Sequence, residues 1–194
     1  NLTVIDSNQC TSQFDTTTTV FCQPIASALV TNGTCLGQIT EFTNISSPIS
    51  NMNFSWNFGD GNSTTSTDST NIIYHEYSSC STFSVNLYVS DDDNFCTDDT
   101  TIFVTIHCPP TASFLADPVC SGDTLFLIDN STPGDGNIIS WNWSNNIFNT
   151  IDNDTSYIIL DPCNNIGLQS LVITDDNGCN SSWQNPIYQY CNPT

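Results

Sequence analysis

A cysteine pattern that occurs twice, about 85 residues apart, constrains this chain more than any other feature. The gap from a cysteine to a tryptophan is 21 residues in both copies, and the gap between two later cysteines is 16 residues in both. The matching positions are Cys22, Cys35, Trp56, Cys80, Cys96 and Cys108 in the first copy and Cys108, Cys120, Trp141, Cys163, Cys179 and Cys191 in the second. Because this period is too long for a solenoid repeat and fits a small domain, it predicts two copied domains.

The pattern also continues towards both ends of the chain. A pair of cysteines 12 residues apart ends each copy, and Cys10 and Cys22 have the same spacing. The predicted division is residues 1–21, the terminal strand pair of a preceding or donated repeat; 22–107 and 108–191, two domains; and 192–194, the start of a next unit or a tail. Either the sequence is a piece of a longer tandem array, or it is a subunit with a spare terminal hairpin.

The charge of the chain excludes several classes of partner. It contains no Lys or Arg and 20 Asp plus Glu, which gives a net charge of −20. Such a field repels nucleic acid and anionic membrane surfaces. Hydrophobic residues still make up 38% of the chain, enough for packed cores. No apolar run reaches the length of a membrane span, so we expect neither a nucleic-acid partner nor a membrane-spanning segment.

The ten cysteines indicate an oxidising compartment. Zinc is the competing interpretation, but the sequence has no close Cys-x-x-Cys pair, and only His75 and His107 could assist. We therefore expect disulfides and a location outside the cell or on its surface.

Short strands separated by turn signals run through both copies. Residues 84–90 alternate strictly, so that Val85, Leu87 and Val89 face one side, as in a half-buried strand. About seven strands in each unit, with one buried tryptophan, predict tandem immunoglobulin-like β-sandwich domains, an all-β fold.

The first copy also carries motifs of a known family. Phe54–Gly61 reads Phe-Ser-Trp-Asn-Phe-Gly-Asp-Gly, followed by Tyr74, Tyr77 and the strand Phe83–Asp91. Residues 24–106 resemble a PKD (polycystic kidney disease) domain through these motifs, whereas the second copy keeps Trp141 but loses Gly-Asp-Gly. The resemblance implies an immunoglobulin-like sandwich, an extracellular location, frequent tandem arrays and no catalysis of its own. The family also includes spacer modules of secreted proteases and polysaccharide-degrading enzymes.

The order of strands in a sandwich suggests a disulfide scheme. Cys35 lies between the first and second strands and Cys80 between the fifth and sixth, so both belong at the same end of a unit. Cys22 and Cys96 belong at the other end. The predicted pairs are Cys35–Cys80, Cys120–Cys163, Cys22–Cys96 and Cys108–Cys179, with Cys10 and Cys191 left for bonds between subunits.

Nine Asn-x-Ser/Thr sequons make glycosylation a second expectation. A secreted chain offers such sites to glycosylation enzymes, and sequons in turns are the most accessible. The predicted acceptors are Asn1, Asn32, Asn44, Asn53, Asn62, Asn130, Asn142, Asn153 and Asn180.

Metal binding and catalysis have weaker signals. Asp91, Asp92 and Asp93 are candidate Ca²⁺ ligands, with Asp175 and Asp176 as their equivalents, but a solvated turn explains the same residues and no EF-hand spacing is present. No Gly-x-Ser-x-Gly motif accompanies the two histidines. We therefore expect no cofactor, with Ca²⁺ as a weak exception, and no enzyme activity.

Together these features favour a non-catalytic extracellular structural protein. It would be a repeat unit of a surface rod or fibril, glycosylated and cross-linked by disulfides, with further copies of itself joined head to tail as partners. The alternative is an adhesin stalk or a carbohydrate-binding accessory module of a larger secreted enzyme. That alternative requires an exposed aromatic platform, for which Trp183 in the last strand is the candidate.

Overall fold

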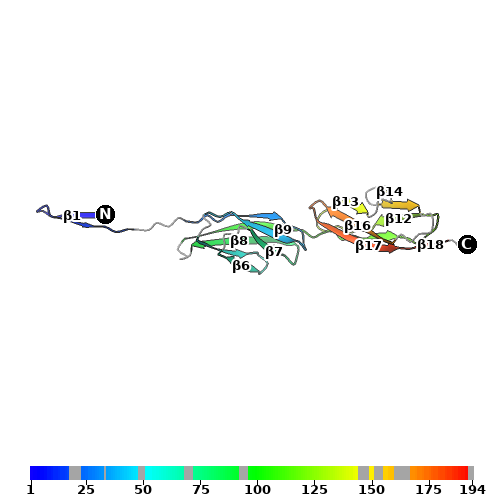
Figure 1. Ribbon diagram of the computed structural model, residues 1–194, viewed down its shortest axis with the longest axis horizontal. Coiled ribbons are helices and arrows are strands. Elements are labelled where there is room, and N and C mark those ends of the chain that lie inside the picture. Colours follow the sequence, from blue (N-terminus) through cyan, green and yellow to red (C-terminus); the bar gives the residue numbers. More distant parts are fainter. Residues whose placement is uncertain are drawn as a thin grey trace.

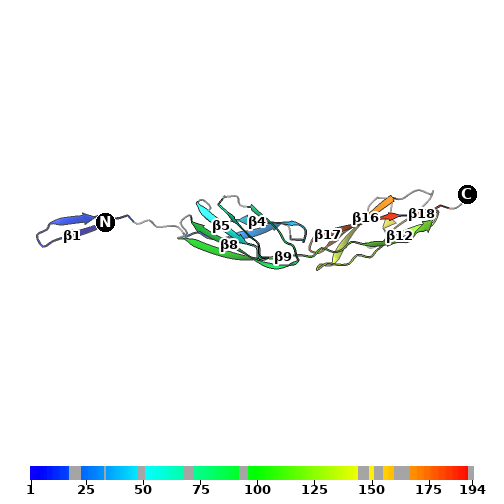
Figure 2. The same ribbon diagram turned by 90° about the horizontal axis from the view of Figure 1, so that it is seen from below.

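The computed structural model describes residues 1–17, 23–32, 34–47, 51–67, 72–91, 96–143, 149–150, 155–159 and 167–191. Every helix or strand element in these ranges is a β-strand, which confirms the all-β fold class. Figures 1 and 2 show two sandwiches placed end to end and a separate hairpin near the N-terminus. In the described part of the chain we find no helix with the length and apolar character that crossing a membrane requires.

The first sandwich consists of a three-stranded and a four-stranded sheet, both antiparallel. One sheet has the order β3-β4-β7, with β3 at Ala28–Asn32, β4 at Ile39–Asn44 and β7 at Ile72–Glu76. The other has the order β6-β5-β8-β9, with β5 at Met52–Asn57, β6 at Ser63–Ser66, β8 at Ser81–Asp91 and β9 at Thr97–Ile106. Alternate residues of β8 are buried in the core between the sheets, as their pattern predicts.

Trp56 connects the two sheets of this sandwich. It lies on β5 with 1% of its surface exposed, and its ring centroid is 5.8 Å from that of Phe42 on β4. Tilted aromatic pairs at this distance contribute about 0.5–1.5 kcal/mol beyond the area that they bury. The tryptophan shared by both copies is therefore a core residue in the first.

The Gly-Asp-Gly motif forms the turn between β5 and β6. Gly59 and Gly61 have positive φ angles of 79° and 96°, and residues with a Cβ adopt such angles only at a cost in free energy. A Cβ on Gly59 would also lie 2.5 Å from the backbone oxygen of Ser84 on β8. The turn thus needs glycine for both its conformation and its close approach to the neighbouring strand.

The second sandwich also consists of a four-stranded and a three-stranded sheet, both antiparallel. One sheet has the order β10-β12-β15-β14, with β10 at Phe114–Ala116, β12 at Thr124–Asp129, β14 at Asn149–Thr150 and β15 at Thr155–Ile159. The other has the order β13-β16-β17, with β13 at Ile138–Trp143, β16 at Gly167–Asp175 and β17 at Asn180–Ile187. β11 (Val119–Cys120) pairs in parallel with β18 (Gln189–Tyr190). Trp141 is only half-buried here, and its Nε1 donates to Asp129 Oδ2 at 2.8 Å.

The N-terminal hairpin pairs β1 (Leu2–Ile5) with β2 (Thr11–Phe14), and all eight strand residues are exposed. The interpretation of residues 1–21 as the terminal strand pair of another repeat stays a prediction, and residues 18–21 lie outside the described residues. Residues 192–194 lie outside them as well.

Candidate functional site: the junction between the sandwiches

Two disulfides lie where the first sandwich meets the second. Cys35 is bonded to Cys179, with 5.6 Å between their Cα atoms, and Cys80 is bonded to Cys108, with 5.4 Å. Cys35 belongs to the first sandwich and Cys179 to the second, so this bond joins the two domains covalently. Both of its cysteines are buried, at 6% and 0% exposure.

The first sandwich presents Cys35 in the turn that precedes β4. Backbone hydrogen bonds tie this turn to the end of the sandwich: Leu36 donates to the His107 oxygen at 2.9 Å, and His107 donates to the Thr34 oxygen at 2.8 Å. Cys35 and His107 thereby form a parallel bridge. The cysteine is fixed beside the segment that leads into the next domain.

The second sandwich presents Cys179 in the turn between β16 and β17. Oδ1 of Asp175 accepts the backbone N–H groups of Asn177 at 3.0 Å and Cys179 at 2.8 Å. These hydrogen bonds between the aspartate side chain and the backbone hold the turn closed, as short aspartate side chains commonly do in turns. The carboxylate of Asp175 is thus structural.

Polar contacts connect the linker with the loop that precedes β13. His107 Nδ1 lies 3.2 Å from Asp135 Oδ2, and the Asp135 N–H donates to the Cys108 oxygen at 3.3 Å. Asn137 in the same loop donates its side-chain amide to Asp176 at 3.0 Å. This hydrogen bond, with a backbone one from Asn137 and the nearby charge of His107, lowers the pKa of Asp176 below its usual value.

Gly134 allows the loop to approach the linker closely. A Cβ at this position would overlap the carbonyl oxygen of Cys108 and lie 2.7 Å from that of Pro109. Only glycine fits against backbone at such a distance. Gly134, Asp135 and Asn137 were not singled out by sequence, although the Gly-Asp-Gly at 134–136, directly after Pro133, is a signal that could have identified them.

The structure corrects the disulfide scheme. The predicted pairs Cys35–Cys80 and Cys108–Cys179 are wrong, because the same four cysteines pair as Cys35–Cys179 and Cys80–Cys108. The assignment of Cys35 and Cys80 to one end of the first sandwich is correct, but the end-to-end arrangement brings the second sandwich to that end too. Strand order within one domain therefore does not identify the partner.

The remaining cysteines differ in state. Cys120 is exposed without a disulfide partner, so the predicted Cys120–Cys163 pair is also wrong. Cys10 is exposed and unbonded, whereas Cys191 is disulfide-bonded, which removes it from a bond between subunits. Cys163 and the Cys22 of the predicted Cys22–Cys96 pair lie outside the described residues.

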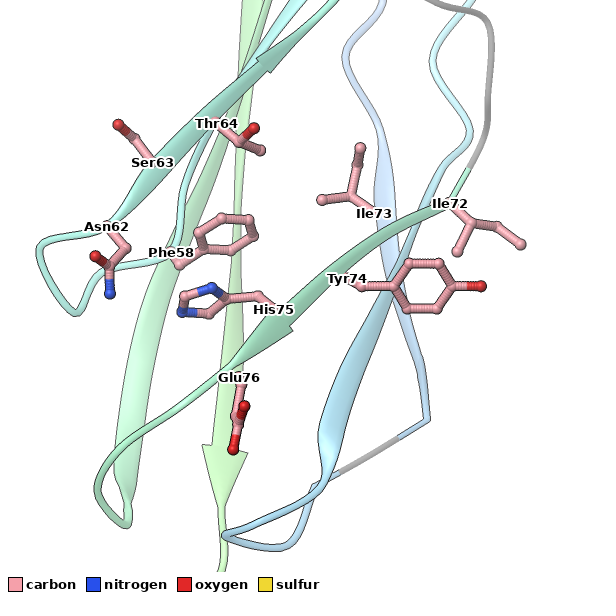
Figure 3. A pocket seen from close by; sticks show the side chains of 9 residues that line it. All are labelled: Phe58, Asn62, Ser63, Thr64, Ile72, Ile73, Tyr74, His75 and Glu76. Carbon is pink, nitrogen blue, oxygen red and sulfur yellow. The ribbon is translucent and has the colours of Figure 1, made fainter.

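His75 lies in an open pocket of about 620 Å³ on the first sandwich. Its ring stacks on Phe58 at 3.9 Å, and its Nε2 is 2.8 Å from Asp60 Oδ2. Figure 3 shows Phe58 and His75 next to one another, with Tyr74 on the other side of β7. The remaining lining residues are Asn62, Ser63, Thr64, Ile72, Ile73 and Glu76.

The groups around His75 shape the Gly-Asp-Gly turn. Burial raises the pKa of Asp60, but the Asn62 backbone N–H and His75 lower it by more, so its pKa lies below the usual 3.8. Burial, with the charge of Asp60, raises the pKa of Tyr77, whose hydroxyl donates to the Phe58 oxygen at 3.1 Å. These contacts indicate a structural role for His75.

The predicted calcium ligands are only partly described. Asp91 ends β8, while Asp92 and Asp93 lie outside the described residues. The neighbouring Asp98 accepts the Ala26 N–H at 2.8 Å, and Asp99 accepts the Asn86 amide at 2.9 Å. Within the described ranges no group of three or more His, Cys, Asp or Glu side chains is arranged to hold a metal, and Ca²⁺ stays a prediction.

The predicted glycosylation sites differ in accessibility. Asn44 is buried at 4% exposure and its Oδ1 accepts the Ser46 N–H at 3.0 Å, which does not suit an acceptor. Asn53 is half-buried on β5, the side chain of Asn32 is not described, and Asn153 lies outside the described residues. The exposed acceptors are Asn1, Asn62, Asn130, Asn142 and Asn180.

Several solved structures are similar to this chain. The crystal structure of the PKD1 domain of Vibrio anguillarum Epp is 22% identical, with 45% of this chain and 98% of that chain covered and a TM-score of 0.37. The fibronectin(III)-like modules of Clostridium thermocellum CbhA are 11% identical, with 86% and 95% covered and a TM-score of 0.40. Bacteroides ovatus SGBP-B, solved with a mixed-linkage heptasaccharide, is 14% identical, with 87% and 48% covered and a TM-score of 0.36.

The chain therefore spans about half the length of that last structure. No curated protein matches the chain. The family model described as PKD domain matches residues 22–106, which are the first sandwich with its preceding segment. The resemblance stated from the Trp-Asn-Phe-Gly-Asp-Gly motif is thus confirmed: residues 22–106 of this chain match the PKD domain family.

Proposed function

We propose that this chain is a non-catalytic structural segment of an extracellular rod or fibril, built from sandwiches joined head to tail. The observation that carries the proposal is the Cys35–Cys179 bond, because it crosses the boundary between two domains. A disulfide used only for the stability of one small domain would close within that domain.

The junction has the mechanics that such a role requires. Domains joined by a flexible linker move relative to one another by default. Here the backbone at Cys108 and the bond at Cys35–Cys179 form two separate covalent connections between the sandwiches. The His107–Asp135 contact and the close approach at Gly134 add a third restraint. Two connections at different points between the sandwiches oppose bending and rotation of one sandwich relative to the other far more than a single connection does.

The stiffness of the junction tests the proposal. Small-angle X-ray scattering of the oxidised chain should fit a narrow range of angles between the sandwiches, and the double variant Cys35→Ser with Cys179→Ser should fit a broader range. The matched control, Cys80→Ser with Cys108→Ser, also lacks one disulfide but keeps the bond between the domains, so its range should stay narrow. Equal ranges for all three proteins would refute a stiffening role.

Glycans are the second partner that we propose, on the exposed sequons of both sandwiches. In a chain without Lys or Arg, sugars at Asn62, Asn130, Asn142 and Asn180 would supply hydrated, uncharged bulk on the outer faces. Enzymatic deglycosylation of protein from its native source should lower its mass, with Asp appearing at the exposed acceptors and unmodified Asn at buried Asn44. An unchanged mass would show bare asparagines.

A further inference from the structure

Cys120 lies in the same local structure as Cys35. Ser121 donates its N–H to the Tyr190 oxygen at 2.9 Å, as Leu36 does to His107 at 2.9 Å. The parallel pairing of Cys120 with Tyr190 likewise repeats the bridge of Cys35 with His107. The end of the second sandwich thus presents a cysteine in the same setting, but its thiol is exposed and unbonded.

Cys10 lies in the same local structure as Cys179. In the hairpin turn, Asp6 Oδ1 accepts the Cys10 N–H at 2.9 Å, where Asp175 Oδ1 accepts the Cys179 N–H at 2.8 Å. The backbone N–H of the aspartate donates to the oxygen of the cysteine at 3.0 Å in the first turn and 2.9 Å in the second. Cys10 is also exposed and unbonded.

The hairpin carries a face of the type that a sandwich core buries. Aligning Asp6 with Asp175 places Leu2 and Val4 at the positions of Leu171 and Ile173, which are completely buried in the second sandwich. In the hairpin both side chains are more than half exposed. This face accordingly needs a neighbour outside the hairpin.

The Cys35–Cys179 bond indicates which thiol of one chain would pair with which thiol of the next chain. Cys35, next to β4 of one sandwich, bonds to Cys179 in the last hairpin of the unit that follows it. Cys120 is the corresponding cysteine of the second sandwich, and Cys10 belongs to the hairpin that precedes the first. The two unbonded cysteines therefore match the two halves of the Cys35–Cys179 bond. Cys10 lies in the N-terminal hairpin, and Cys120 lies at the end of the second sandwich where it pairs with Tyr190.

We propose that Cys120 of one copy and Cys10 of a second copy form a disulfide that joins chains head to tail; this inference rests on the structural function proposed above. The bond forms by thiol–disulfide exchange with a small-molecule disulfide as oxidant. The two thiols lose two protons and two electrons to form the S–S bond, and the oxidant is reduced to two thiols. The partner is thus a second copy of this chain, covalently attached.

Oxidation of the purified chain tests the bond. In a buffer of reduced and oxidised glutathione, non-reducing electrophoresis should show a ladder of multimers that collapses on reduction. Because the chain has no Lys or Arg, pepsin rather than trypsin should release the cross-linked peptide, which should contain Cys10 and Cys120. A cross-link between chains through any other pair of cysteines would overturn the proposal.

Two variants make the test directional. Cys10→Ser and Cys120→Ser should each remain monomeric alone, and an equal mixture of the two should stop at a dimer, since only one productive pair of thiols exists in it. Cys96→Ser, the matched control, should still form the ladder. A dimer from Cys10→Ser alone would indicate a symmetric Cys120–Cys120 bond and would contradict head-to-tail joining.

The disulfide between chains and the proposed stiffening of the junction can fail independently of one another. Absence of the ladder in a protein whose Cys35–Cys179 bond is formed and whose junction is stiff by scattering would overturn this inference alone. A flexible junction with an intact ladder would overturn the proposed stiffening and leave the bond between chains in place.

Discussion

Pulling the oxidised chain from its termini should extend it far less than pulling the reduced chain. The Cys35–Cys179 bond spans a sequence separation of 144 residues, so force passes through the sulfur atoms and the residues between them carry no load. At 3.3–3.6 Å for each extended residue, reduction should add roughly 480–520 Å of contour length. Single-molecule force spectroscopy in the presence and absence of a reducing agent measures this difference.

Serine variants identify the bond responsible for the hidden length. The control that lacks Cys80 and Cys108 should remain as inextensible as the oxidised wild type, because its load still bypasses the segment between Cys35 and Cys179. The variant that lacks Cys35 and Cys179 should extend further under oxidising conditions, although the 28 residues behind Cys80–Cys108 stay hidden. Equal extension of oxidised and reduced wild type would contradict the prediction.

Gly134→Ala should open the junction while leaving both cores folded. The added methyl group would overlap the Cys108 carbonyl oxygen, which is backbone and cannot rotate away. Overpacking of this kind costs about 1–3 kcal/mol, enough to displace the loop and weaken the His107–Asp135 contact. Dithiothreitol should then reduce Cys35–Cys179 roughly 5- to 140-fold faster, since each 1.4 kcal/mol corresponds to a factor of ten. Timed alkylation and mass spectrometry would follow the reaction.

The matched control for this variant is Gly122→Ala. Gly122 lies beyond β11, at the other end of the second sandwich, and has a φ of +93°, with nothing within 4 Å of the position that a Cβ would occupy. Alanine there strains a turn of the same domain without touching the junction, so the reduction rate should match that of the wild type. If both variants accelerated reduction equally, general destabilisation of the second sandwich would explain the result.

Local patterns were enough to predict the sandwiches. The alternation in β8 depends only on which face of a strand each residue occupies, and the structure buries Val85, Leu87 and Val89 accordingly. The Gly-Asp-Gly turn is also predictable from the sequence, because the positive φ angles at Gly59 and Gly61 depend on a few adjacent residues. These features follow from sequence neighbours, and so they are accessible before any tertiary contact is known.

The cysteine repeat predicted copied units and the ends at which cysteines gather, but it did not identify their partners. A disulfide requires Cα atoms about 4.4–6.8 Å apart, and several cysteines at one junction meet the coarser condition of lying at the same end. Which ones come within that distance depends on how the second sandwich stacks on the first, through the linker at Cys108 and the loop at Gly134. The partner of Cys35 is 144 residues away in the next domain, and a local sequence pattern cannot identify a partner at that separation.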